Sequence, residues 1–217
     1  MKKNAIRLAV VSALAVVYAV PAIAETVGPE EARVKWTASV VKKSDVTLNV
    51  FAEGNTALDF EWNPASQAFS TQDRTLTVLA SGYQGGTGYK IQAQVMKDTL
   101  NATAGGVKDS LKVGVNLGGI QLDQNLTDIL SGTSANAAPT IAANGLQNMN
   151  LAKAGPNKTP NGSYHQANGV PVKFSITEGT DKDGKALSGA TLSEISDGRY
   201  DGDVEVRFVA SWEKPSA

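Results

Sequence analysis

The 217-residue sequence contains no cysteine and only one histidine. Without cysteine there are no disulfides, so packing and main-chain pairing must hold the fold, and thiol catalysis is excluded. The histidine, His165, lies in the polar stretch NGSYHQANG. Zinc sites draw on cysteine and histidine, and a Ser/His/Asp site needs neighbours that position its histidine. We therefore predict a solvated loop histidine, no metal site and no cofactor.

Long apolar runs are confined to the start of the chain. Three cations precede a predominantly apolar run over residues 8–20, which is followed by Pro21 and the small residues of 22–24. These are the parts of a secretory signal peptide, and the run is too short to anchor a protein permanently in a bilayer. We predict a signal peptide over residues 1–24, with cleavage after Ala24.

A basic surface is also missing. Removal of the signal peptide takes away three cations and no acids, so the formal net charge changes from −1 to −4. No polybasic patch remains, which argues against nucleic acid or an anionic membrane surface as a partner. The remaining 193 of the 217 residues suffice for one domain with a substantial core.

Helical periodicity is scarce, and apolar and polar residues alternate with a period of two instead. This pattern is typical of an all-β domain. The predicted strands cover residues 33–41, 46–52, 57–62, 74–80, 89–96, 111–117, 120–122, 171–177 and 204–212. Asn63-Pro64 predicts a turn, and Gly118-Gly119 predicts a hairpin.

The alternation fails over residues 123–169, where Gly, Ala, Asn, Ser, Thr and Pro dominate. We predict a long surface connection there, with one helical turn at LTDIL and a short strand around PTIA left open. Residues 178–198 are predicted to form a second polar connection. Its DKDG stretch is interpreted as a turn, because Ala190 stands where a calcium loop would need a bidentate Glu.

Three tryptophans and two carboxylates give the alternative functions their only support. Trp36, Trp62 and Trp212 would suit a secreted monomeric β-sandwich carbohydrate-binding module, in which they stack on sugars. Each tryptophan is in phase with the apolar face of its predicted strand, which favours core packing. Asp59 and Glu61 stand two apart on one strand, as expected of a solvated face, so we predict that the protein is not an enzyme.

The first predicted strand poses the question of its partner. ARVKWTASVV, near the start of the mature chain, and VEVRFVASWE, near its end, have the same alternation around a tryptophan. An alternating strand needs a neighbour for its backbone and an apolar floor for its alternate side chains. If the first strand docks in its own subunit, it is one more strand of that sandwich. Docking in a neighbouring molecule would make a head-to-tail fibre, as in donor-strand complementation of pilins.

Four stretches carry a resemblance to a known family: RVKWTAS with KK after it, LDFEW, LKVGVNLGG and DGRYDGDVEVRFVASW. They resemble the major fimbrillin of the common pilus, the Mat or Ecp fimbriae, over about residues 32–212. The resemblance implies an incomplete immunoglobulin-like β-sandwich completed by an N-terminal donor strand. A donor-strand extension would then span residues 25–44, and the pilin domain residues 45–217.

The family also implies roles for particular residues. Val34, Trp36, Ala38 and Val40 would anchor the donor strand, and Val204, Val206, Phe208 and Ala210 would line the acceptor groove. The polar tail EKPSA beyond Trp212 has no assigned role.

The resemblance further implies partners and a location. The chain would pass through the periplasm with a periplasmic chaperone and an outer-membrane usher. It would then polymerise with identical subunits into a surface fimbrium that supports adhesion and biofilm formation. A tip adhesin and a host-cell receptor are further candidate partners.

Overall fold

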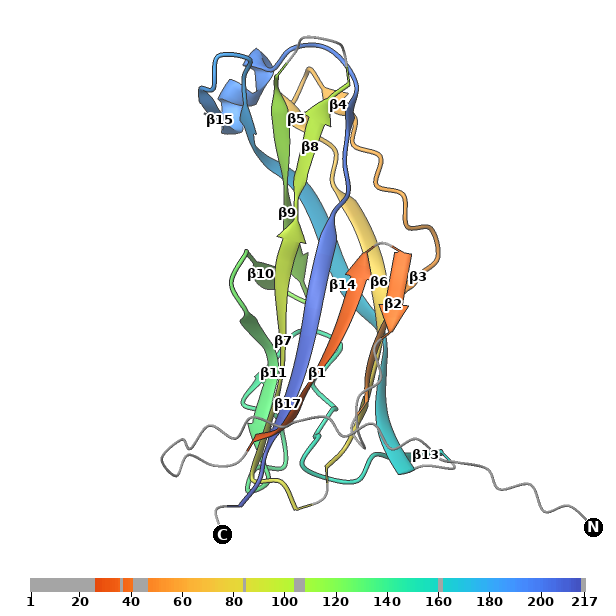
Figure 1. The fold of residues 1–217 in the computed structure, drawn as a ribbon. Helices are drawn as coiled ribbons and strands as arrows, with labels where there is room; N and C mark the ends of the chain where they lie inside the picture. The colour runs from red at the N-terminus through yellow and green to blue at the C-terminus, as the bar shows by residue number, and fades with distance from the viewer. Residues whose placement is uncertain are drawn as a thin grey trace, which may run out of the picture.

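The protein is described here by a computed structural model, whose ribbon is drawn in Figure 1. The described residues are 26–35, 37–40, 47–83, 85–103, 108–159 and 162–215. Within these ranges, no helix has the length and apolarity needed to cross a bilayer. The predicted signal peptide and Trp36 lie outside them. The described chain forms two large antiparallel sheets and one separate two-stranded sheet, which confirms the predicted all-β sandwich, immunoglobulin-like in architecture.

The first sheet holds both the start and the end of the described chain. Its strand order is β12 (Ile141–Ala142), β11 (Thr127–Thr133), β7 (Gly88–Lys97), β17 (Glu205–Glu213), β1 (Thr26–Lys35) and β2 (Thr37–Val40). The C-terminal strand β17 therefore pairs with β7 on one side and with the N-terminal strand β1 on the other. The sandwich is completed by an N-terminal strand, which here belongs to the same chain.

The second sheet has the order β16 (Tyr200–Asp201), β8 (Thr99–Ala102), β9 (Ser110–Leu117), β14 (Gly162–Thr180), β6 (Gln72–Ser81) and β3 (Leu48–Glu53). Three short strands add to it: β10 (Ile120–Leu122) on β9, and β13 (Asn157–Thr159) and β15 (Ala186–Ser188) on β14. The hairpin β4 (Trp62–Asn63) and β5 (Ala68–Phe69) and the 3-10 helix η1 (Gly189–Glu194) lie at the end of the molecule away from the C-terminus (Figure 1).

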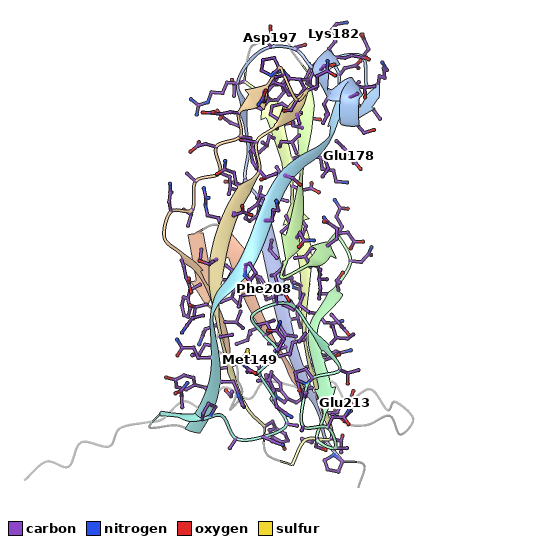
Figure 2. All side chains as sticks on the ribbon, turned by 180° about the vertical axis from the view of Figure 1, so that it is seen from behind. Met149, Glu178, Lys182, Asp197, Phe208 and Glu213 are labelled. Carbon is purple, nitrogen blue, oxygen red and sulfur yellow. The ribbon has the colours of Figure 1, made fainter. Side chains whose placement is uncertain are left out.

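The core lies between the sheets and follows the predicted alternation. On β6 the residues Leu76, Val78 and Ala80 are buried, and on β17 so are Val206, Phe208, Ala210 and Trp212. Figure 2 places Phe208 in the middle of the long axis of the sandwich. Trp212 is fully buried, and its indole Nε1 donates a hydrogen bond to the Leu151 carbonyl at 3.2 Å, so its single polar group is satisfied.

The predicted connection over residues 123–169 is partly wrong. Apart from Leu126, LTDIL lies in strand β11 and not in a helical turn, because β11 pairs with β7. A register shift between Asp128 and Leu130 lets the consecutive residues Ile129 and Leu130 both be buried, which is what a β-bulge does. The sequence gives no sign of this bulge, and without it two consecutive apolar residues do not fit the alternation of a strand. The helical turn was predicted for that reason. The strand left open around PTIA exists as β12.

The predicted strand over residues 57–62 is also largely wrong, since only Trp62 belongs to a strand. The main chain before it has side-chain partners instead of a ladder: Arg74 donates to the Ala57 carbonyl and Gln72 to the Asp59 carbonyl. The alternation still holds, because Leu58, Phe60 and Trp62 pack against the core while Asp59 and Glu61 are exposed.

His165 does not lie in a solvated loop. It belongs to β14, which pairs with β6 across this stretch, and its side chain is only 7% exposed. The ring Nε2 lies 3.3 Å from the Lys153 carbonyl oxygen. Burial lowers the pKa of the imidazole, because a charged ring loses its hydration there. The prediction failed because Ala167 is the only apolar residue that marks the buried face of NGSYHQANG.

Candidate strand-docking site

The C-terminal strand β17 forms one wall of the site. The four residues predicted to line an acceptor groove are all buried, and they point between the sheets: Val204, Val206, Phe208 and Ala210. Three of them lie on β17, and Val204 precedes it directly. Their alternation with Glu205 and Arg207 keeps them on one face of the sheet.

Strand β1 covers the free edge of β17. The two strands are antiparallel, with Val34 opposite Val206, Ala32 opposite Phe208 and Glu30 opposite Ala210. The register shifts between Val27 and Glu30, and Gly28-Pro29 fills this irregularity. Proline has no N–H to give a ladder, so its place at a bulge is the one that a paired strand tolerates. The sequence of β1 therefore fits a strand only around this break.

The opposite wall is strand β3, the edge of the second sheet. It contacts both β1 and β17, and its residues Leu48 and Val50 are buried. We define the docking site as the strip between β17 and β3 that β1 fills. Without β1 and β2, β17 would become the edge of its sheet, and the apolar residues of both walls would open to water.

Edge strand β3 is held in place by its own side-chain network. The Glu53 carboxylate accepts hydrogen bonds from Thr77 Oγ1, from the Gly169 amide at 3.1 Å and from Thr75 Oγ1 at 2.8 Å. These bonds lower the pKa of Glu53, since they favour the ionised form. They tie β3 to β6 and to the bulge of β14, so this wall does not depend on β1.

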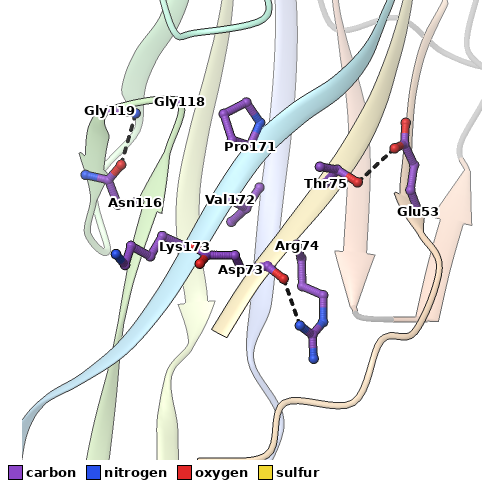
Figure 3. Close-up of a pocket in the computed structure, with 10 residues that line it drawn as sticks. All are labelled: Glu53, Asp73, Arg74, Thr75, Asn116, Gly118, Gly119, Pro171, Val172 and Lys173. Atoms are coloured by element: carbon purple, nitrogen blue, oxygen red, sulfur yellow. Dashed lines mark hydrogen bonds between the residues drawn. The ribbon is translucent and has the colours of Figure 1, made fainter. Parts of the chain in front are cut away.

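Figure 3 shows the shallow pocket beside this network, of about 370 Å³, on the outer face of the second sheet. Glu53, Asp73, Arg74 and Lys173 are among the residues that line it. Its charges are mixed, and no histidine or serine stands beside a base. The lining hydroxyl that meets a carboxylate is that of Thr75, and its hydrogen bond to Glu53 belongs to the network that fastens β3.

The predicted donor residues are divided between two strands. Val34 lies on β1, Ala38 and Val40 lie on β2, and Trp36 is outside the described residues. Strand β2 pairs antiparallel with β1, with Ala38 opposite Val34 and Val40 opposite Ala32. One continuous strand over residues 33–41 is therefore wrong for this chain folded on itself.

The chain reverses from β1 into β2 because it must reach Thr47, which precedes β3. Thr26 lies opposite Glu213, at the end of the sandwich where β17 ends. Thr47 lies at that same end of the sandwich. Its carbonyl accepts a hydrogen bond from the amide of Ser81, at the end of β6. Thr87 follows shortly after Ser81 in the sequence, just before β7, and its amide donates to the Glu213 carbonyl, so the ends of β6 and β17 lie together. A strand that starts at this end and runs to Lys35 must come back to reach Thr47. Strand β2 is that return.

The tryptophans do not make a common surface. Trp212 is fully buried, which confirms core packing for this residue. Trp62 is half-buried, with its ring edge-on to Phe69 at a centroid distance of 5.0 Å. A sugar platform needs exposed coplanar rings, and these two rings do not provide one. Among the described residues, no group of three or more His, Asp or Glu side chains is placed to hold a metal ion.

Comparison with known proteins gives one family match. The model of a family described as fimbrillin MatB matches residues 30–212. That range contains both walls of the docking site and most of β1.

Individual relatives are similar over much of their length. The common pilus major fimbrillin subunit EcpA of Klebsiella pneumoniae (strain 342) is 25% identical over 217 residues, covering 98% of this chain and 99% of the relative. EcpA of Escherichia coli (strain K12) is 26% identical over 182 residues, covering 81% and 83%. Among solved structures, the CooA pilin subunit from enterotoxigenic Escherichia coli has a TM-score of 0.41 and 14% identity, covering 75% of this chain and 86% of that one.

Proposed function

The chain belongs to the fimbrillin MatB family, and we propose that its N-terminal segment completes the sandwich of the next subunit in a pilus. Fimbrillins are structural subunits and not enzymes, so the protein is a pilus subunit that polymerises with its own kind at the cell surface. The proposal concerns how the subunits join. Donor-strand exchange would make each subunit the donor to one neighbour and the acceptor of another.

The observation that carries the proposal is the position of β1 at the start of the described chain and between the two edges β17 and β3. Because β1 and β2 precede every other strand of the described residues, they can leave without breaking the chain connections between those strands. The same segment of a second copy can then make the same pairing with β17. Such an exchange is head-to-tail and does not close on itself, so it builds a fibre.

The energies involved are large enough to matter. Eight residue pairs join β1 to β17, which corresponds to about eight main-chain hydrogen bonds worth roughly 4–12 kcal/mol net. Uncovering Val206 and Phe208 would cost about 1.5–3 kcal/mol for each. Whole domains are stable by only about 5–15 kcal/mol. A subunit without a docked strand would therefore be marginal, whichever copy supplies the strand.

An open docking site also explains the partners that we propose. An unpaired edge beside exposed apolar residues promotes aggregation, so a periplasmic chaperone would cover the site until assembly at an outer-membrane usher. In an isolated subunit, the N-terminal segment is tethered close to the docking site of its own chain. Its effective concentration there is high, so it docks in the same subunit. Residues 1–24, 25–44 and 45–217 would be the signal peptide, the donor extension and the pilin domain. The finished fimbrium would support adhesion and biofilm formation, with a tip adhesin and a host-cell receptor as further partners.

The test removes the donor and then restores it where it cannot be shared. We expect purified mature protein to form filaments in electron micrographs, and protein lacking residues 25–40 to form none. A control that lacks these residues but carries them on a flexible linker after Ala217 should be a stable monomer. Filaments from the deleted protein would refute the proposal.

A further inference from the structure

An open cavity lies where β17 begins, at the end of the sandwich that carries β4, β5 and η1. The first sheet stops there at Lys97 and Glu205, whereas the second sheet continues through β8, β9 and β14. The space left inside the continuing sheet has a volume of about 530 Å³. Its lining includes Phe60, Trp62, Phe69, Leu111, Ile176 and Tyr200.

One side of the cavity is an incompletely covered part of the apolar core, and the rest of its lining is polar and includes Asp59, Arg199 and Asp201. Leu111 is buried, and Ile176 points the same way from β14, but Phe60, Trp62, Phe69 and Tyr200 are only partly covered. In a closed sandwich, a strand of the first sheet would lie over these side chains and exclude water. None of the described strands does so, because β1 pairs with β17 only as far as Lys35 opposite Glu205.

A continuation of the β1–β17 pairing beyond Lys35 would run along this cavity. If the pairing continued one residue at a time beyond Lys35, Trp36 would lie opposite Val204, Ala38 opposite Gly202 and Val40 opposite Tyr200. Val204 is buried, and Gly202 and Tyr200 line the cavity. A continued strand would thus carry its alternate apolar residues along the opening.

The chain cannot do this for itself, because it must return to Thr47 through β2. The return also lacks suitable turn residues: β1 and β2 are separated by Trp36 alone, between Lys35 and Thr37, where tight hairpins favour glycine or asparagine. Trp, Thr and Val instead favour an extended strand. The sequence of residues 33–41 therefore suits a continuous strand better than the hairpin that its own fold imposes.

We propose that the cavity receives residues 36–40 of a second copy of this chain, whose N-terminal segment docks as one unbroken strand. The proposal rests on strand exchange between subunits and adds to it a change of shape: the β1–β2 hairpin opens when the segment changes hosts. The donor needs no return in its new host, since it arrives from a neighbouring subunit. The gain of the cavity contacts would then favour the fibre over the self-docked monomer.

Two cysteine pairs distinguish the hairpin from the continuous strand, and the absence of native cysteine keeps the readout clean. In the hairpin, Ser39 lies opposite Arg33, so the Arg33→Cys/Ser39→Cys variant should form an internal disulfide in the monomer. In the continuous strand, Ser39 would lie opposite Asp201 of the neighbour. The hairpin keeps these two positions roughly 20 Å apart along the strand axis, far beyond the reach of a disulfide.

The expected result is a ladder. Oxidised fibres of Ser39→Cys/Asp201→Cys should give dimers, trimers and higher species on non-reducing gels, which reductant collapses, while the monomer before assembly gives none. Fibres without this ladder would overturn the continuous strand and leave strand exchange itself standing. Failure of the unmodified protein to form fibres would instead count against the exchange mechanism.

A cavity-filling variant tests the cavity separately. Ile176→Trp should fill the space, keep or raise the thermal midpoint of the monomer, and lower fibre yield by about tenfold or more, a factor that corresponds to 1.4 kcal/mol. The matched control is Gln166→Trp, at an exposed position of the same strand, which should leave fibre yield unchanged. Normal fibres from Ile176→Trp would contradict the proposal. Loss of the monomer fold would shift the test to the smaller change Ile176→Phe, with the same two outcomes.

Discussion

A charge placed on the docking strand should separate docking from every other property of the subunit. Val34 lies opposite Val206, whose side chain is 1% exposed. Residues directly opposite each other on paired strands share a face of the sheet, so the register assigns position 34 to the face of Val206. At a position that faces the core, a Val→Asp substitution removes about 1.5–3 kcal/mol of apolar burial and adds a carboxylate whose desolvation costs several kcal/mol. We therefore expect a loss of at least about 4 kcal/mol in the free energy of unfolding, or release of the segment from the site.

The matched control is Arg33→Asp, one residue earlier and opposite Arg207. Its register position alternates to the other face, so its effect should stay within about 0.5 kcal/mol. Urea unfolding followed by tryptophan fluorescence gives both stabilities, and electron microscopy gives filament formation. Val34→Asp protein that is as stable as the unmodified chain and still polymerises would refute the assigned register.

Three further predictions concern groups away from β1. Burial lowers the pKa of His165, so stability should fall as the pH drops below about 6.5, by at most about 1.4 kcal/mol per pH unit; His165→Gln should lack this component when unfolding is compared across that range. Thr77→Val removes a hydrogen bond to Glu53 and should cost about 1 kcal/mol, measured by thermal unfolding; an unchanged midpoint would mean that the bond does not fasten β3. Burial, with the Asp109 carboxylate nearby, raises the pKa of Tyr200 to about 12, so the ultraviolet difference titration between the unmodified protein and Tyr200→Phe should show ionisation near that pH, and ionisation near 10 would contradict the burial of this phenol.

The alternation of apolar and polar residues was enough to predict the sandwich, because the alternate apolar residues of each core strand mark the face that is buried. Strand β17 is the clearest case: Val206, Phe208, Ala210 and Trp212 were placed on one face from the sequence alone, and all are buried. The hairpin at Gly118-Gly119 also formed as predicted, with Ile120 opposite Leu117. Both glycines have positive φ, a backbone conformation that glycine adopts more readily than other residues, so this turn could be predicted from the sequence.

Features that depend on a distant partner could not be predicted. Strand β1 extends to Thr26 through a proline and two glutamates, residues that no strand propensity favours, because β17 offers it a free edge. The reversal into β2 depends on where Thr47 lies, and that is known only once both sheets are built. His165 is buried because β6 pairs with β14 alongside it, which its polar neighbours conceal.

In the isolated subunit the strand beside β17 comes from the same chain, and in the fibre we propose that a neighbouring subunit supplies it. Arg33 and Arg207 lie opposite each other in the register, so Arg33→Cys/Arg207→Cys should close a disulfide wherever β1 meets β17. In the isolated monomer that bond should be internal. In oxidised fibres we expect it to join neighbouring subunits and to give a ladder on a non-reducing gel, whereas fibres that release only internally bonded monomers would contradict the claim.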